Sequence, residues 1–205
     1  MIARTAERLK ELEEECKGVH GYPCDVTDFD ELDKTITAIR TDLGKPSVLV
    51  HNAVGGAFGS FLEIEPSVLE KNFQVNTMSL LHLGRMLAPD MISAGEGSIV
   101  ITGNTSAYRG MPGFAGFAPT KAAQRVLAES MARDLGPKGV HVSYVAIDAV
   151  IDLEWTRKRM PDQPDDYFCH PRDIAEECFR IAHQPKSAWS FASVIRPFGE
   201  NWSIS

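Results

Sequence analysis

Ser98-Ile99-Val100-Ile101-Thr102-Gly103 is a run of apolar residues that ends in threonine and glycine. A short apolar run of this kind predicts a strand that is buried on both faces, as in a parallel sheet. The chain holds three similar runs, at Ser47–His51, Val140–Ile147 and Ala192–Arg196. We expect the central parts of these four strands (residues 48–51, 99–102, 142–145 and 192–195) to be neighbours that form the dependable core.

Helical patterns separate these strands. The expected helices are Arg4–Lys17, Thr27 or Asp28 to Leu43, Pro66–Ala88, Phe117–Leu135 and Pro171–His183, with a short strand at Val19–Cys24. Alternation of helix and strand predicts right-handed crossovers and a parallel sheet covered on both faces. We therefore expect one α/β domain over residues 1–205, in which only Asp148–Tyr167 is irregular.

Composition narrows the function classes. The chain has 205 residues and a formal charge of 21 − 28 = −7, which disfavours non-specific nucleic-acid binding. No apolar stretch approaches the roughly 20 residues that span a bilayer, so no membrane partner is expected. The four cysteines are far apart and His51, His141 and His170 are scattered, so we expect no metal site and a reducing, cytoplasmic location.

Six short motifs occur in one order along the chain: Asp25-Val26, Asn52-Ala53, Asn76, Thr102–Ser106, Phe117–Ala123 and Gly136–Val142. Together they resemble the short-chain dehydrogenase/reductase family over nearly the whole chain. The resemblance implies a Rossmann-like, doubly wound parallel sheet and an NAD(P)-dependent oxidoreductase that acts on a small carbonyl or alcohol. It also implies a homodimer or tetramer assembled through the helices that contain Asn76 and Lys121.

The match begins at about the family's second strand. The family's first strand and its glycine-rich turn G-x-x-x-G-x-G, which holds the dinucleotide pyrophosphate at a helix N-terminus, have no counterpart in the sequence. We therefore expect a sheet truncated at the N-terminus, without its first βα unit and with two strand edges unpaired. Either the chain is an incomplete gene product, or rearrangement or a partner fills the gap.

The resemblance carries a set of cofactor-binding positions onto this chain: Arg4, Asp25, Val26, Asn52, Ala53 and Lys121. It implies NAD or NADP as the cofactor, with binding weakened by the absent turn. Each position also has a simpler interpretation. Asp25 could cap its own turn, Asn52 could bond its own backbone, and Lys121 could be a solvated helix lysine.

The catalytic positions of the resemblance are degenerate. Four side chains act in the family, and they fall here on Asn76, Asn104, Phe117 and Lys121, where the family has Asn, Ser, Tyr and Lys. Phenylalanine has no proton to give, and the Asn104 amide can donate a hydrogen bond but has no hydroxyl. Phe117 and the Asp148 segment point to an atypical bacterial subgroup.

Two functions stay open at this stage. One is a weakened or inactive NAD(P)-dependent oxidoreductase, and the other is a catalytically silent protein of the same fold that acts through binding or dimerisation. Ser106 or Tyr108 could replace the lost hydroxyl, although packing is the more common role of a loop tyrosine. Trp155, Met160 and Tyr167 could line an apolar substrate pocket.

Overall fold

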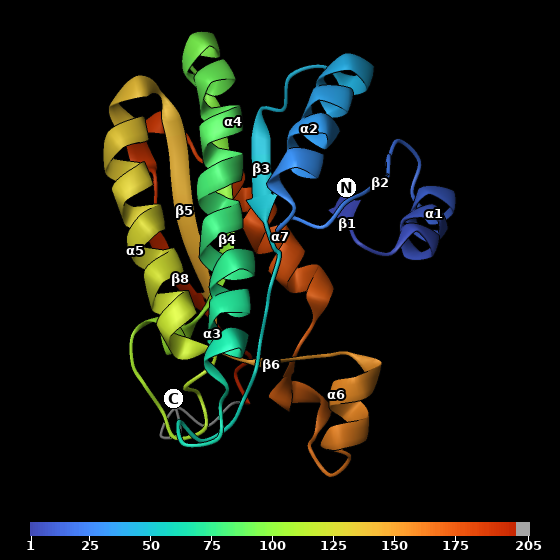
Figure 1. Ribbon diagram of the computed structural model, residues 1–205, viewed down its shortest axis with the longest axis vertical. Coiled ribbons are helices and arrows are strands. Elements are labelled where there is room, and N and C mark those ends of the chain that lie inside the picture. Colours follow the sequence, from blue (N-terminus) through green and yellow to red (C-terminus); the bar gives the residue numbers. More distant parts are fainter. Residues whose placement is uncertain (200–205) are drawn as a thin grey trace.

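The computed structural model describes residues 1–199 (Figure 1). The strands are β1 (Ile2–Ala3), β2 (Tyr22–Pro23), β3 (Val48–His51), β4 (Gly97–Asn104), β5 (Val140–Ile147), β6 (Val150–Ile151), β7 (Phe168–Cys169) and β8 (Ala192–Ile195). The α-helices are α1 (Ala6–Glu15), α2 (Phe29–Leu43), α3 (Pro66–Phe73), α4 (Ser79–Ala94), α5 (Ala118–Leu135), α6 (Glu154–Arg159) and α7 (Pro171–Ala182). A π-helical turn, η1 (Gln74–Met78), joins α3 to α4, and a 3₁₀ turn, η2 (Thr105–Ala107), follows β4.

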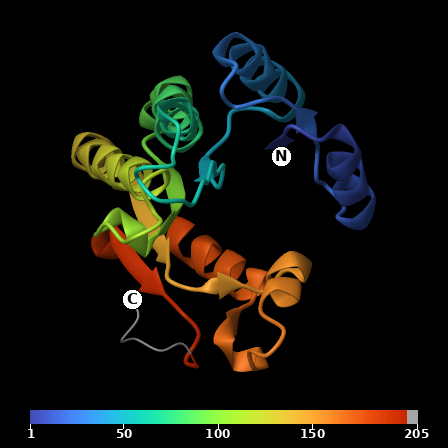
Figure 2. The same cartoon turned by 60° about the horizontal axis from the view of Figure 1, so that its bottom comes forward.

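The main sheet has four parallel strands in the order β3-β4-β5-β8, so the predicted core is confirmed. Successive side chains of β4 enter different layers, as the alternation of a strand requires. Ile99 and Ile101 are buried under α4 and α5, whereas Val100 is buried with Ile174 and Ile181 of α7. Figure 2 shows α4 and α5 on one side of the sheet and α7 on the other. The fold is therefore a doubly wound α/β sheet.

The N-terminal strands stand apart from this sheet. β1 and β2 form their own two-stranded parallel sheet, and β3 pairs only with β4 among the described residues. In Figure 1, β1, β2 and α1 lie to one side, beyond α2. Val48 and Val50 of β3, whose side chains lie on the same face of the sheet as Val100, are 37% and 48% exposed. The expectation that the early strands have no strand neighbour in the main sheet is thus confirmed for the part of the chain that the structure describes.

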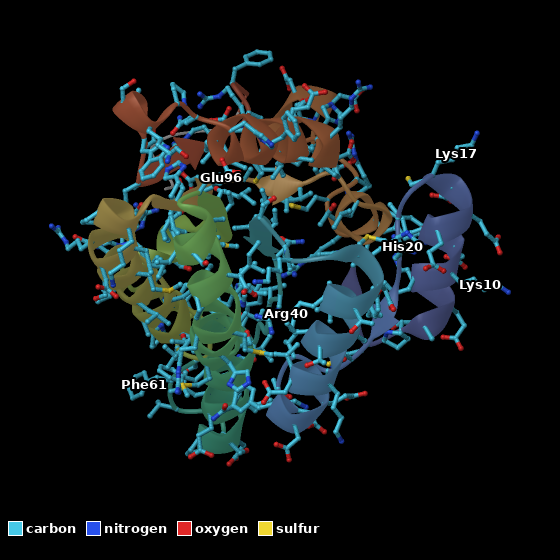
Figure 3. All side chains as sticks on the ribbon, turned by 90° about the horizontal axis from the view of Figure 1, so that it is seen from above. Lys10, Lys17, His20, Arg40, Phe61 and Glu96 are labelled. Carbon is cyan, nitrogen blue, oxygen red and sulfur yellow. The ribbon has the colours of Figure 1, made fainter. Side chains whose placement is uncertain are left out.

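Helix α2 attaches this N-terminal part to the main body. Its Arg40, labelled in Figure 3, donates a hydrogen bond to the Met86 carbonyl of α4 at 2.7 Å and forms an ion pair with Asp90 at 2.8 Å. The helix begins where the Asp28 carboxylate accepts from the Glu31 N–H at 3.0 Å. It ends at Gly44, whose φ of 87° suits glycine.

Three expected boundaries were wrong. The long helix does not stop at Ala88 but continues through Pro89 to Ala94, because Met91 is buried against the sheet and this packing outweighs the proline. Helix α1 begins after Thr5 and ends at Glu15, so it is shorter than the expected Arg4–Lys17. Likewise, the strand expected over residues 19–24 is only β2, because the isolated pair has no further partner.

The segment Asp148–Tyr167, expected to be irregular, is instead partly ordered. It contains β6 and α6, and β6 pairs in parallel with β7 to close a small unit. Arg157 supports this unit because its guanidinium bonds Asp152 and Asp165 and stacks 4.0 Å from the Phe168 ring centre. These contacts join residues far apart in the segment, which is why a local pattern did not reveal them.

Candidate functional site

A cavity of about 880 Å³ separates the β1–β2 pair from the open edge of β3. Five of the six predicted cofactor residues line it, from three different segments of the chain: Arg4, Asp25, Val26, Asn52 and Ala53. Each of the three segments follows a parallel strand, and ligands of doubly wound sheets bind outside the carboxyl ends of such strands. The structure therefore brings these five predicted residues together around one cavity, whereas the sixth, Lys121, is not among the residues that line it.

Asp25 both caps its own turn and lines the cavity. Its Oδ1 accepts hydrogen bonds from the Thr27 backbone N–H at 2.9 Å and from the Thr27 hydroxyl at 2.8 Å. These bonds, chiefly the backbone one, hold the pKa of the Asp25 carboxyl below its ordinary value, and the charges of Arg4 and Lys71 add to the effect. Lys71 of α3 also lines the cavity, a cation that the sequence reasoning missed. Asp25 is therefore a fixed anion beside two cations.

Asn52 and Asn76 order the loop that follows β3. The Asn52 Oδ1 accepts from the Thr102 hydroxyl at 2.6 Å, which ties the end of β3 to β4. Asn76 is fully buried in the π-helical turn, and its amide exchanges bonds of 2.9 and 2.8 Å with the N–H and carbonyl of Gly55. A further bond of 2.8 Å runs from the Asn76 Nδ2 to the Thr120 hydroxyl. Asn76 thus fastens the π-helical turn to the loop after β3 and to the start of α5.

Asn104 has a structural role at the end of β4. Its Nδ2 donates to the Ile147 carbonyl at 2.9 Å, and its Oδ1 accepts from the Ser106 N–H at 2.9 Å, capping η2. These two bonds leave the second Nδ2 hydrogen of Asn104 unused, so Asn104 can offer a ligand a single N–H. This is weaker assistance than a serine hydroxyl, which both donates and accepts.

Phe117 is buried at the start of α5, among other aromatic side chains. Its ring centre lies 5.5 Å from that of Phe58 and 6.5 Å from that of Phe114. The ring is 8% exposed, and the Lys121 ammonium lies 5.8 Å from its centre. The residue that the resemblance aligns with a proton-donating hydroxyl therefore lies in an apolar, aromatic cluster.

Lys121 is the most perturbed cation of the site. Its side chain is buried, with the residue 3% exposed, and burial lowers the pKa of the ammonium to about 8. The ammonium donates to the Gln124 Oε1 at 2.9 Å and to the Thr102 carbonyl at 3.4 Å. The interpretation of Lys121 as a solvated lysine is thus wrong. A buried cation with a perturbed pKa is typical of a functional site.

Neither candidate replacement hydroxyl lies on the Lys121 face of α5. Ser106 and Tyr108 line a second cavity, of about 390 Å³, together with Ala118 and Ala122 of α5. Successive helix positions are about 100° apart, so Ala118 and Ala122 define a different face from Phe117 and Lys121. Trp155, proposed for an apolar pocket, is 62% exposed.

Sequence reasoning missed several polar residues beneath the site. Gln124 and His51 are buried next to Lys121, and the Asp148 carboxylate at the end of β5 pairs with Arg196 and accepts from the Thr105 hydroxyl. Gln124 could have been found from its spacing of three from Lys121, which places both on one helix face. Within residues 1–199, no metal-binding group of three or more acidic, His or Cys side chains is present, and no helix is long and apolar enough to cross a bilayer.

Fold and site together define a doubly wound α/β protein of the type that binds ligands at the carboxyl edge of a parallel sheet. The sequence model of the family described as "short chain dehydrogenase" matches residues 1–162. The chain therefore belongs to the short-chain dehydrogenase family, and its relatives are oxidoreductases.

Individual relatives agree with this family. Carbonyl reductase [NADPH] 2 of Sus scrofa is 27% identical over 204 residues, which are 95% of this chain and 82% of the relative. D-erythrulose reductase of Gallus gallus is 31% identical over 145 residues, 70% of this chain and 57% of the relative. The solved structure of a metagenomic short-chain oxidoreductase in complex with NADP has a TM-score of 0.81 and 26% identity, covering 97% of this chain and 85% of that one.

Proposed function

We propose that this chain is an NAD(P)-binding oxidoreductase of the short-chain dehydrogenase family in which proton transfer is severely slowed. The observation that carries the proposal is the buried Lys121 ammonium, which has two neutral acceptors and no carboxylate among its bonded partners. A buried lysine without an acidic partner is costly to keep charged. Such a group is retained most readily where a ligand rich in hydroxyls or phosphates supplies the missing acceptors.

The residues around the cavity fit a nicotinamide dinucleotide in part. Asp25 is an anion suited to hydroxyl or amine hydrogens of an adenosine, and Arg4 and Lys71 are cations available to its phosphates. Asn52 lines the cavity at the carboxyl end of β3, and the Lys121 ammonium bonds the Thr102 carbonyl near the carboxyl end of the neighbouring β4. When bound, the dinucleotide would supply hydride chemistry. The names of two relatives contain NADPH or NADP, which supports this choice of cofactor class.

The side chains of the site are better suited to binding and orienting a ligand than to transferring a proton. Phe117 offers no proton, and Asn104 retains at most one uncommitted N–H. Positioned acid–base catalysis contributes roughly 10²–10⁴-fold to a rate, so we expect a loss of that order for a small carbonyl or alcohol substrate. Phe117 also supports placing the chain in an atypical subgroup of the family.

A direct binding experiment tests the proposal. Titration of the purified chain with NADPH and NADH, followed by nicotinamide fluorescence, should give saturable micromolar binding. Lys121→Met keeps the length of the side chain but removes the charge, and it should weaken binding by about tenfold or more, as expected for a lost charged hydrogen bond. Lys158→Met, on exposed α6, is the matched control. A folded wild-type chain that binds neither nucleotide contradicts the proposal.

The second candidate is a catalytically silent protein of this fold, and Phe117 is the specific observation that favours it. Assembly into a homodimer or tetramer belongs to both candidates and stays a prediction. Nicotinamide absorbance in the presence of a panel of small carbonyls distinguishes the two candidate functions, because the silent protein would transfer no hydride to a carbonyl. Light scattering at working concentration tests assembly, and a clean monomer mass contradicts it.

A further inference from the structure

Gln124 lies directly behind Lys121, in the interior of the protein. The two residues are three positions apart on α5, and Gln124 is fully buried. Its Oε1 accepts from the Lys121 ammonium at 2.9 Å, which is the shorter of the two bonds that the ammonium makes. A buried glutamine must satisfy both ends of its amide, so its Nε2 needs acceptors on the other side.

Those acceptors come from two other elements. The Gln124 Nε2 donates to the Asn76 carbonyl in the π-helical turn at 2.7 Å, and it lies 3.4 Å from the Nδ1 of His51 on β3. The His51 Nε2 is 2.8 Å from the Ser79 Oγ. Ser79 in turn donates its hydroxyl hydrogen to the Val75 carbonyl at 2.5 Å. The network therefore joins α5, η1, α4 and β3.

The direction of each bond follows from this chain of contacts. Because Ser79 uses its hydrogen on Val75, its oxygen accepts from the His51 Nε2–H. The His51 Nδ1 then carries no proton and accepts from Gln124. Burial, followed by the nearby Lys121 charge, lowers the pKa of His51 to about 4, so the ring stays neutral at neutral pH. The Asn76 carbonyl and the unprotonated Nδ1 of His51 together hold the Nε2 of Gln124, so that its amide oxygen faces Lys121.

We propose that Gln124, oriented by neutral His51, is a positioning residue that holds the Lys121 ammonium at the carboxyl end of β4. The groups facing the ammonium are the Thr102 carbonyl of β4, the Phe117 ring and Gln124 oxygen of α5, and the His51 ring of β3 behind Gln124. An amide does not accept a proton at neutral pH, so this network fixes the cation and does not relay a proton. The inference rests on the proposed function in one respect only, namely that the ligand held by Lys121 is a nicotinamide dinucleotide.

The pKa of Lys121, followed by NMR of its labelled side chain and assigned with Lys121→Met, tests the inference directly. Gln124→Leu removes the acceptor, so the Lys121 pKa should fall by about one unit. Gln124→Glu places a charge at the same point, so the pKa should rise above that of the wild type. His51→Leu removes the weaker of the two Nε2 acceptors while the Asn76 carbonyl still holds the amide, so it should lower the pKa less than Gln124→Leu does. Exposed Gln163→Leu should leave it unchanged.

Shifts of opposite sign in the Glu and Leu variants are the expected result, because a merely structural glutamine would give no such pair. An equal pKa in the wild-type, Glu and Leu proteins overturns the inference, and if the Leu variant does not fold, the comparison of wild type with Glu decides alone. A parallel NADPH titration should weaken about tenfold in Gln124→Leu. If the wild type binds no NADPH, the proposed function fails while the pKa measurement still judges the role of Gln124.

Discussion

The Lys121 ammonium lies 5.8 Å from the centre of the Phe117 ring, and the Lys121 backbone N–H donates to the Phe117 carbonyl at 3.2 Å. The cation therefore faces the electron-rich side of an aromatic ring, where the family places a hydroxyl that the lysine activates. The resemblance aligns Phe117 with the hydroxyl on which the lysine would act, and phenylalanine has no hydroxyl. Under the proposed function, this pairing accounts for nucleotide binding together with weak chemistry in one site.

Restoring both lost hydroxyls should restore chemistry. In Phe117→Tyr combined with Asn104→Ser, the new phenol lies one helical turn from Lys121, and the serine can still cap η2. We expect NADPH-dependent carbonyl reduction to rise by roughly 10²-fold or more over the wild type. Turnover is measured from nicotinamide absorbance over a panel of small carbonyls. Phe114→Tyr, in the same aromatic cluster, is the control, and no gain in the double variant would favour the silent protein.

The buried His51 should make the fold sensitive to mild acid. Its pKa is about 4 in the folded protein against 6.5 when unperturbed, so between these values the unfolded chain binds more protons. The free energy of unfolding therefore falls as the pH is lowered from about 6.5 towards 4, by an amount on the order of 3 kcal/mol. Urea denaturation across this range measures it. His51→Leu should flatten this part of the profile, whereas exposed His20→Leu should not, and parallel profiles in all three proteins would rule the explanation out.

Gly103 should tolerate no side chain. A Cβ at this position would overlap the ring of Tyr144, which is fully buried against β4. Gly103→Ala should therefore cost about 3 kcal/mol of stability, as overpacking of a core does. At Gly110 a Cβ meets nothing within 4 Å, so Gly110→Ala is the control. Equal urea midpoints for the two variants would show that Tyr144 is not fixed there.

The pair Asp148–Arg196 should contribute more than the surface pairs do. Their side chains are 8% and 13% exposed, at the carboxyl ends of β5 and β8. Asp148→Asn keeps the shape but removes one charge of this buried pair, which should cost about 3 kcal/mol. Glu154→Gln breaks an α6 pair with Lys158 whose side chains are 84% and 76% exposed, and should change stability by about 0.5 kcal/mol or less. Thermal or urea unfolding compares them, and a small effect of Asp148→Asn would be contrary to this assignment.

The fold was predictable from sequence because local hydrophobic patterns mark the strands of its main sheet. Each core strand is a short apolar run, and each helix has an apolar stripe, so the order of elements implied the parallel sheet. Two of the errors arose because tertiary contacts outweigh local propensity. Packing carries α4 through Pro89, and the ion pairs of Arg157 help to order the Asp148–Tyr167 segment.

The site was predictable only where a motif marked it. The motifs located the cavity residues Asp25 and Asn52 and the buried Lys121, but they gave no reason to consider Gln124. Its role depends on which carbonyls and rings lie behind α5, and those come from β3 and the π-helical turn. The lack of space for a side chain at Gly103 was likewise not predictable from a local pattern, because it depends on the packing of Tyr144 from the neighbouring strand.

Mapping NADPH onto the folded chain tests the central claim most directly. Backbone amide NMR shifts would be followed as NADPH is added to the wild-type chain and to Lys121→Met. The account predicts saturable shifts concentrated at Arg4, Asp25–Val26, Asn52–Gly56 and Lys121, with much weaker binding in the variant. Absence of shifts in the wild type, or shifts confined to α6 and α7, would contradict a nucleotide site between the β1–β2 pair and β3.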